Sequence, residues 1–177
     1  MGSFVYFLEP EGIDLIKIGY SVSPRSRVVS QMQWSPIPVT LLATAPGDAF
    51  SEAQLHHRFR ADRQHCEWFK VSDELRALVE EAATTGRIQG LLMDPCPRTG
   101  SLFSREWRLR AVIKKLGLSP EELAEWCGWK VGSIAQAVLY PRPSIVAALF
   151  EYARVHGIPL SPDEFCARPV TPEVEAA

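Results

Sequence analysis

Two short apolar runs open the chain and predict an antiparallel pair of strands. Residues 4–8 and 15–18 are mostly apolar, and the segment 9–12 between them carries the Pro and Gly of a hairpin turn. Ser23 followed by Pro24 is typical of a helix start, because Ser caps a helix and Pro fits its first position. The first elements predicted are therefore a hairpin and a helix.

The pattern then changes from strand to helix once more. Residues 39–45 form an apolar run that indicates a third, buried strand, after prolines that end the first helix. From residue 49 to 59 the apolar positions recur at helical spacing. Glu52 and His56 are four residues apart in this segment, so they share one face of the predicted helix.

A small sheet flanked by helices would be complete by about residue 83. Residues 66–71 have the features of a short strand or a turn, and another helix is predicted from Asp73. The fold class expected for residues 1–83 is α+β, with a mostly antiparallel sheet. Residues 84–102 are rich in Thr, Pro and Gly, a composition typical of a linker between domains.

The second half of the chain changes to short amphipathic helices. Ser119 and Glu122 form a capping box in front of one of them, and Gly128 can supply the left-handed turn that separates it from the next. Residues 103–168 resemble a helix-turn-helix domain of the lambda-repressor-like class, an all-α fold. A flexible tail is expected over residues 169–177.

Composition and charge narrow the class of protein. The chain has 177 residues, 46% of them hydrophobic and 23% charged, which is enough for a buried core. No apolar run is long enough to cross a bilayer, no signal peptide is apparent and the four cysteines form no CxxC pair, so a cytoplasmic protein with reduced thiols is expected. The net charge of −2 means that any nucleic-acid binding must come from local basic clusters.

The order of chemically useful residues in the first eighty positions points to phosphodiester cleavage. Tyr6 ends the apolar run Phe4-Val5-Tyr6, Lys17-Ile18-Gly19 follows the turn, and Glu67-Trp68-Phe69 closes the region. Over residues 4–80 this order resembles the GIY-YIG endonuclease superfamily, in particular its phage and fungal branch with KIG, an arginine helix, ExxLH and EWF.

The resemblance implies a role for each matched residue. Tyr6 would orient or deprotonate the attacking water, and Arg27, ten residues after Lys17, would neutralise charge on the transition state. Glu52 would hold one Mg²⁺ or Mn²⁺ ion against the scissile phosphate. Arg25 on the same predicted helix would contact DNA.

Two departures from the family pattern leave the general base open. Lys17 stands where a tyrosine is usual, and a lysine serves as a base only if its surroundings lower its pKa. Gln31 stands where some relatives place a second acid or base, and His56 could supply that function from the Glu52 helix. Without a competent base the domain would bind nucleic acid and not cut it.

The second domain supplies candidates for DNA contact. In a helix-turn-helix domain the exposed face of the third helix reads base edges in the major groove. The candidates here are Lys130, Ser133 and Gln136, with Arg142 just beyond the helix positioned to bind a phosphate. Few cations lie on this face, and the acidic side chains at 121, 122 and 125 would repel DNA if they faced it.

The sequence therefore favours one function and leaves two others open. The favoured hypothesis is a Mg²⁺-dependent DNA endonuclease, a phosphodiester hydrolase directed to DNA by its helix-turn-helix domain. The alternatives are a DNA-binding regulator with an inactive nuclease-like domain, and a protein-interaction adaptor whose helical domain only dimerises. The sequence leaves open whether the chain is a homodimer, and whether its substrate is single-stranded, double-stranded or branched DNA, or RNA.

Overall fold

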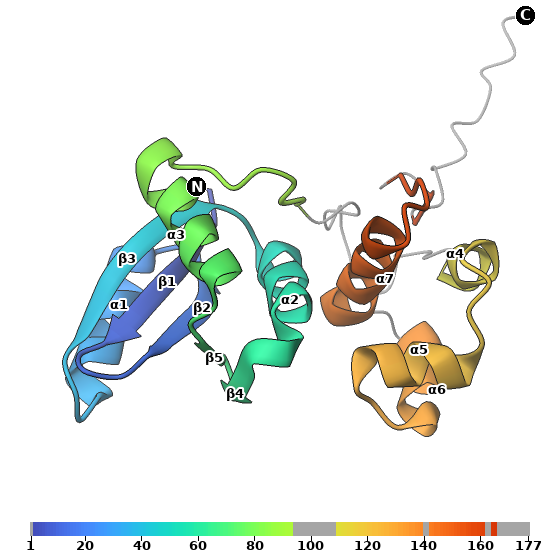
Figure 1. Cartoon of the computed structure of the whole chain (residues 1–177), viewed down its shortest axis with the longest axis horizontal. Helices are drawn as coiled ribbons and strands as arrows, with labels where there is room; N and C mark the ends of the chain where they lie inside the picture. The colour runs from blue at the N-terminus through green and yellow to red at the C-terminus, as the bar shows by residue number, and fades with distance from the viewer. Residues whose placement is uncertain (1, 94–108, 140–141, 162–163, 166–177) are drawn as a thin grey trace, which may run out of the picture.

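The protein has an N-terminal sheet unit and a C-terminal helical unit (Figure 1). The computed structural model describes residues 2–93, 109–139, 142–161 and 164–165. We call residues 2–93 the sheet unit and the described residues from 109 onward the helical unit. Within these ranges, no helix combines the length and the apolar character that a membrane crossing requires.

Five antiparallel strands form the sheet, in the order β3-β1-β2-β5-β4. The α+β class expected from the sequence is confirmed. The strands are β1 (Phe4–Pro10), β2 (Leu15–Ser21), β3 (Val39–Pro46), β4 (Arg63–His65) and β5 (Trp68–Lys70). The hairpin β1-β2 and strand β3 lie where the apolar pattern predicts them, but β3 is an edge strand of which only Val39, Ala43 and Ala45 are buried, so the expected burial of the whole strand was wrong. Strand β4 has no apolar pattern and was not predicted.

Helices cover both faces of this sheet (Figure 1). They are α1 (Pro24–Trp34), α2 (Ala49–Arg58) and α3 (Asp73–Thr85), with a 3-10 turn η1 (Arg60–Asp62) after α2. On β1, Val5 and Phe7 face the core shared with α2 and α3, while Tyr6 and Leu8 face Val28 of α1. The alternation of β1 therefore assigns its side chains to two cores, one on each face.

Four helices make up the helical unit: α4 (Leu109–Lys115), α5 (Pro120–Cys127), α6 (Val131–Leu139) and α7 (Pro143–Val155). The predicted capping box is present, since Ser119 Oγ accepts from the Glu122 N–H and Glu122 Oε2 accepts from the Ser119 N–H. Gly128 has φ of 67° and ends α5 in the left-handed conformation that the tight turn to α6 requires.

Helix α2 joins the two units, because it lies between the sheet and α7 (Figure 1). Phe50 of α2 is 1% exposed and belongs to the core of the helical unit, where its ring meets Phe150 of α7 edge-on at 5.7 Å. Gln54 Nε2 donates to Glu151 Oε1 of α7 at 3.5 Å. The two units therefore share a packed interface.

The segment after α3 packs on α2 as well. Thr84 and Thr85, which the composition assigns to the linker, form the end of α3. Beyond them, the Leu92 N–H donates to Gln54 Oε1 at 3.0 Å, and Ser51 Oγ donates to the Leu92 carbonyl at 2.7 Å. Residues 86–93 are thus held against α2, whereas the remaining linker residues 94–102 and the tail 169–177 lie outside the described residues.

Candidate active site

The candidate site lies where β2 loses its strand partner. β5 pairs with β2 only along Leu15, Ile16 and Lys17, so the later residues of β2 meet α2 on that side. The Ile18 carbonyl accepts a hydrogen bond from His56 Nε2 at 2.9 Å, and the Tyr20 N–H donates to the Glu52 carboxylate. Backbone groups of a strand edge therefore fix two side chains of one helix face, as their four-residue spacing predicts.

Glu52 is the most perturbed carboxyl of this site. Its burial, together with the negative charge of Glu67, raises its pKa from 4.5 to about 7, although the Tyr20 N–H and the charges of Lys17 and Arg27 oppose the rise. A carboxyl of this kind gains a proton near neutral pH unless a further positive charge lies beside it. The surroundings of Glu52 therefore favour the approach of a cation.

Lys17 is held by an ion pair on the same strand edge. Its Nζ lies 2.9 Å from Glu67 Oε2 and 5.7 Å from the centre of the Trp68 ring, and only 11% of its side chain is exposed. An ammonium group that donates to a carboxylate has no lone pair for a proton. This geometry suits charge neutralisation or phosphate binding better than the role of a base.

Tyr6 reaches the site through Gly19. The tyrosine is 2% exposed and pairs with Gly19 across the β1-β2 hairpin. A Cβ on Gly19 would lie 2.5 Å from both Cζ and Oη of Tyr6, so only glycine leaves room for the ring. Gly19 stands between Ile18 and Tyr20, whose backbone groups bond His56 and Glu52.

Two arginines of α1 were predicted to act here, and their surroundings differ. Both Arg25 and Arg27 are exposed, but the charge of Arg27 lies close enough to Glu52 to lower its pKa. Each residue of an α-helix is rotated by about 100° from the one before it, so residues two apart point in nearly opposite directions. The two arginines therefore cannot serve the same site in the same way.

His56 is a neutral ring with a defined tautomer. Burial lowers its pKa, and the hydrogen bond to the Ile18 carbonyl opposes this shift only in part. Because a carbonyl oxygen can only accept, the neutral ring carries its proton on Nε2 and leaves a lone pair on Nδ1. The ring also packs against Phe69, with 5.1 Å between the ring centres.

Glu67 is the participant that the sequence did not identify. Its motif, Glu67-Trp68-Phe69, contributes to the resemblance in the sequence, but no role was predicted for the glutamate, and Phe69 of this motif is fully buried. The glutamate nevertheless pairs with Lys17 and raises the pKa of Glu52, and its backbone carbonyl accepts from the Ile18 N–H at 3.0 Å. Its position directly before the short strand β5, which pairs with β2 at Lys17, was the signal available.

These carboxyl groups fit a magnesium ion that is held partly by its substrate. The described residues contain no group of three or more His, Cys, Asp or Glu side chains that could hold a metal. Mg²⁺, however, is commonly bound by one or two carboxylates together with waters and substrate phosphates. Glu52, with Glu67 as a second carboxylate nearby, meets that lower requirement.

The DNA-contact candidates of the helical unit lie on or next to α6 and α7. Lys130, Ser133 and Gln136 are all exposed. Lys130 directly precedes α6, and Ser133 and Gln136 are rotated by about 100° and 200° around the helix axis from the buried Ile134. Arg142 is exposed at the start of α7. Helix α6 itself contains no charged residue, so Lys130 is the cation nearest to this face along the chain.

Comparisons of the chain with protein-family models, curated proteins and solved structures found no match.

Proposed function

We propose that the sheet unit is a Mg²⁺-dependent endonuclease that hydrolyses phosphodiester bonds in DNA, and that the helical unit contacts the DNA. The observation that carries this proposal is the set of charged groups around the free edge of β2. A half-buried carboxyl with a pKa of about 7, a second carboxylate and two cations surround one short stretch of backbone. Perturbed carboxyls with specific charged partners are typical of catalytic sites.

Each side chain can be given a chemical task. Glu52, with Glu67 beside it, would hold Mg²⁺, and the ion would supply positive charge to the phosphate and acidity to a water. Arg27 would neutralise the charge that develops on the phosphate oxygens, and Lys17 would bind the phosphate. His56 Nδ1 offers a lone pair for the proton of the attacking water.

Tyr6 keeps a positioning role in this scheme. Its ring is almost completely buried and its hydroxyl end lies over Gly19. From there it supports the strand edge that orients Glu52 and His56. The observations thus favour His56 over Tyr6 and Lys17 as the general base.

The decisive experiment replaces one carboxyl and keeps a matched control. We expect Glu52→Gln to reduce cleavage of labelled DNA by about 10²- to 10³-fold or more, the cost of removing one strong transition-state contact. Glu80→Gln, an exposed glutamate of α3, should cleave at the wild-type rate. EDTA should abolish cleavage by both wild type and Glu80→Gln. Equal rates for the two variants, or cleavage in EDTA, would refute the proposal.

A DNA-binding regulator with an inactive nuclease-like domain is the second candidate. The observation that favours it is the ion pair between Lys17 and Glu67, which occupies the position of a potential base. In that case single- and double-stranded substrates would remain uncut with Mg²⁺ or Mn²⁺. DNA binding would persist, and it would be the same with metal and with EDTA.

A further inference from the structure

A cleft between the two units adjoins the candidate active site. It has a volume of about 520 Å³, and His56, which bonds the β2 edge, is also one of its lining residues. The lining residues on which the inference depends are His57, Arg60, Arg63, Glu125, Trp126 and Trp129. α2 and the turn after it form one wall, and α5, its turn to α6, and α7 form the other.

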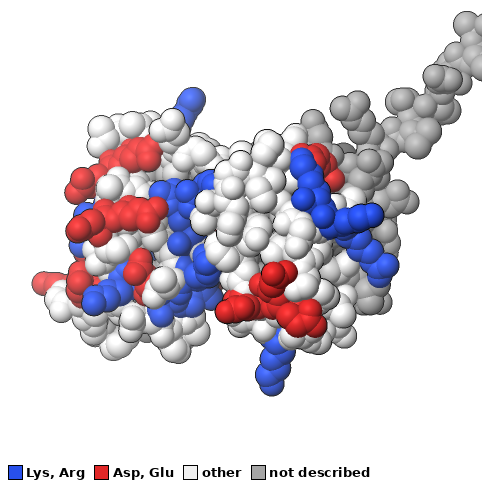
Figure 2. All heavy atoms as spheres, turned by 45° about the vertical axis from the view of Figure 1, so that its right-hand side comes forward, with Lys and Arg blue, Asp and Glu red and all other residues white. Residues whose placement is uncertain are grey.

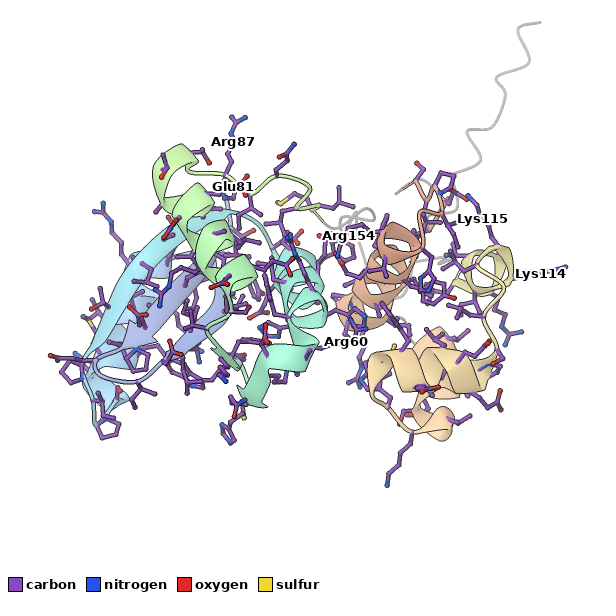
Figure 3. All side chains as sticks on the ribbon, in the orientation of Figure 1. Arg60, Glu81, Arg87, Lys114, Lys115 and Arg154 are labelled. Atoms are coloured by element: carbon purple, nitrogen blue, oxygen red, sulfur yellow. The ribbon has the colours of Figure 1, made fainter. Side chains whose placement is uncertain are left out.

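The charge of the cleft favours an anion. Arg60 and Arg63 are exposed cations on the wall formed by the sheet unit, and Glu125 is the single acidic residue in the lining. Arg60 stacks on Trp126 with 3.8 Å between its Cζ and the ring centre, and Arg63 lies over Phe69 at 5.3 Å. Aromatic rings thus support both guanidinium groups. Arg60 Nη1 already donates to the His57 carbonyl at 3.1 Å, so its other N–H groups and those of Arg63 would meet an oxygen acceptor in the cleft. Figure 2 shows basic side chains in a band on the side of the sheet unit toward the helical unit, and Figure 3 shows Arg60 reaching from the end of α2 toward α5.

His57 gives an independent sign that the cleft takes a polar ligand. Its Nε2 is buried and has no hydrogen-bond partner among the described residues. Burial, with the charges of Arg60 and Arg63, lowers the pKa of His57 to about 3, so the ring is neutral at physiological pH. A buried polar atom without a partner is costly, and a ligand group that bonds it would remove that cost.

The size and the lining of the cleft fit an unpaired strand better than a duplex. Ligand pockets of about 300 to 1,000 Å³ enclose molecules of nucleotide size. Duplex DNA is usually read by an element that projects into a groove, and such an element needs phosphate-binding cations around it. Helix α6 contains no charged residue, whereas the cleft has two arginines and, in Trp129, an aromatic side chain on its other wall. Cations combined with an aromatic platform are the usual means of binding single strands.

We infer that the cleft between the units binds an unpaired nucleotide of a nucleic-acid strand, with Arg60 and Arg63 on its phosphate and Trp129 beside its base. The inference rests on the proposed nuclease function and names its substrate class, a single-stranded or locally unpaired segment. Glu52 and His56 are one turn apart on α2, about 6 Å along the axis. A strand bound in the cleft therefore continues past His56 to the scissile phosphate.

Binding without cleavage tests this inference separately from the nuclease. The full chain with Glu52→Gln, in EDTA, is titrated against a fluorescently labelled single-stranded oligothymidine and against a duplex that contains it. We expect the single strand to bind more tightly, and Arg63→Glu to weaken its binding at least tenfold with a smaller salt dependence. Arg87→Glu removes another exposed arginine, which lies far from Arg60 (Figure 3), and should change the affinity less than twofold.

A second variant and a competitor complete the test. Trp129→Leu should weaken the single strand several-fold while the thermal unfolding midpoint shows that the protein is folded. Equal effects of Arg63→Glu and Arg87→Glu, or duplex binding as tight as that of the single strand, would overturn the inference. Competition by thymidine monophosphate as strong as that of the oligonucleotide would also overturn it, because the cleft would then hold a free nucleotide.

The two proposals fail in different ways. Cleavage that depends on Glu52 but not on Arg63 would preserve the nuclease and refute the strand-binding cleft. Strand binding that depends on Arg63, without any cleavage by the wild type, would support the cleft and refute the nuclease.

Discussion

Charged side chains gather for different reasons in the two units. In the helical unit many of them lie at helix ends of the opposite partial charge: Lys114 and Lys115 end α4, and Glu121 and Glu122 begin α5. Such positions stabilise helices through the macrodipole. Local structure accounts for these charges without any ligand.

The charges at the candidate site of the sheet unit have no such local explanation, unlike Asp73 and Glu74, which begin α3. Lys17 lies on a strand, Glu67 lies between two strands, and Arg27 is in the first turn of α1, where its charge opposes the dipole. Glu52 is in the first turn of α2, which would favour its anion, yet burial raises its pKa. The charges that cost stability are therefore the ones around the candidate site, and such charges indicate a function rather than a role in folding.

A substitution at Phe50 tests whether the two units are independent in stability. Phe50→Ala should lower the free energy of unfolding by about 3 to 5 kcal/mol, because a buried ring is lost from the core of the helical unit. Urea unfolding followed by tryptophan fluorescence measures it. Val29→Ala, at an exposed site on α1, should change the stability by less than about 0.5 kcal/mol. A Phe50→Ala protein as stable as wild type would show that α2 does not complete that core.

Two arginines of one helix sharpen the claim about charge. Arg27→Ala should reduce turnover by about 10²- to 10³-fold, because its cation lies close to Glu52, where it would neutralise the charge that develops on the phosphate. Arg25→Ala should mainly weaken DNA binding, and by a few-fold, because its side chain points away from Arg27. Single-turnover cleavage and equilibrium binding distinguish the two effects. Equal losses of turnover in the Arg27→Ala and Arg25→Ala variants would contradict a special role of Arg27 at the site.

Replacing glycine by alanine should change the stability of the protein in opposite directions at one position of each unit. Gly19→Ala should destabilise the protein by about 1 to 3 kcal/mol, because the new Cβ would collide with the end of Tyr6. Gly132→Ala on α6 meets open space in a helix and should stabilise it by up to about 1 kcal/mol. Thermal unfolding of both variants provides the comparison. Destabilisation by Gly132→Ala would contradict it.

The smallest effect concerns pH. Glu52 has a folded pKa of about 7 against 4.5 in the unfolded chain, so the folded state binds more protons between these values. The contribution of Glu52 to stability is therefore present below pH 4.5 and is lost as the pH rises through 7, by about 1 to 2 kcal/mol after solvent screening at this half-buried site.

The difference between wild type and Glu52→Gln isolates that contribution. His57 has the opposite behaviour, since its pKa is lowered from 6.5 to about 3 and its contribution is lost as the pH falls through this range. Subtracting the two unfolding curves at each pH removes the common effect of His57. A difference that does not change between pH 4.5 and 7 would contradict the raised pKa of Glu52.

Much of the fold follows from the sequence because local rules govern it. Two short apolar runs separated by a turn placed β1 and β2, and the Ser119 and Glu122 pair marked the start of α5, where both reciprocal hydrogen bonds are found. Strand β4 escaped because all three of its residues are exposed and its pairing to β5 is irregular. Periodicity detects only elements that bury a face.

The candidate site was predictable only in part. Glu52 and His56 could be placed together because their spacing alone puts them on one helix face. Glu67 could not be added, because its approach to Glu52 depends on how β5 turns back along β2. The partner of Phe50 was equally hidden, since a pattern identifies an apolar face and not the element that covers it.

The sharing of α2 limits how this chain could be re-engineered. A designer who attached the sheet unit to a different targeting module would leave Phe50 exposed to water unless the new module brought a matching α7. The same graft would remove Glu151, the partner of Gln54, and one wall of the cleft. An exchange of modules would therefore have to keep α2 and α7 together. The junction suitable for a graft differs from residues 84–102, the linker that composition indicates.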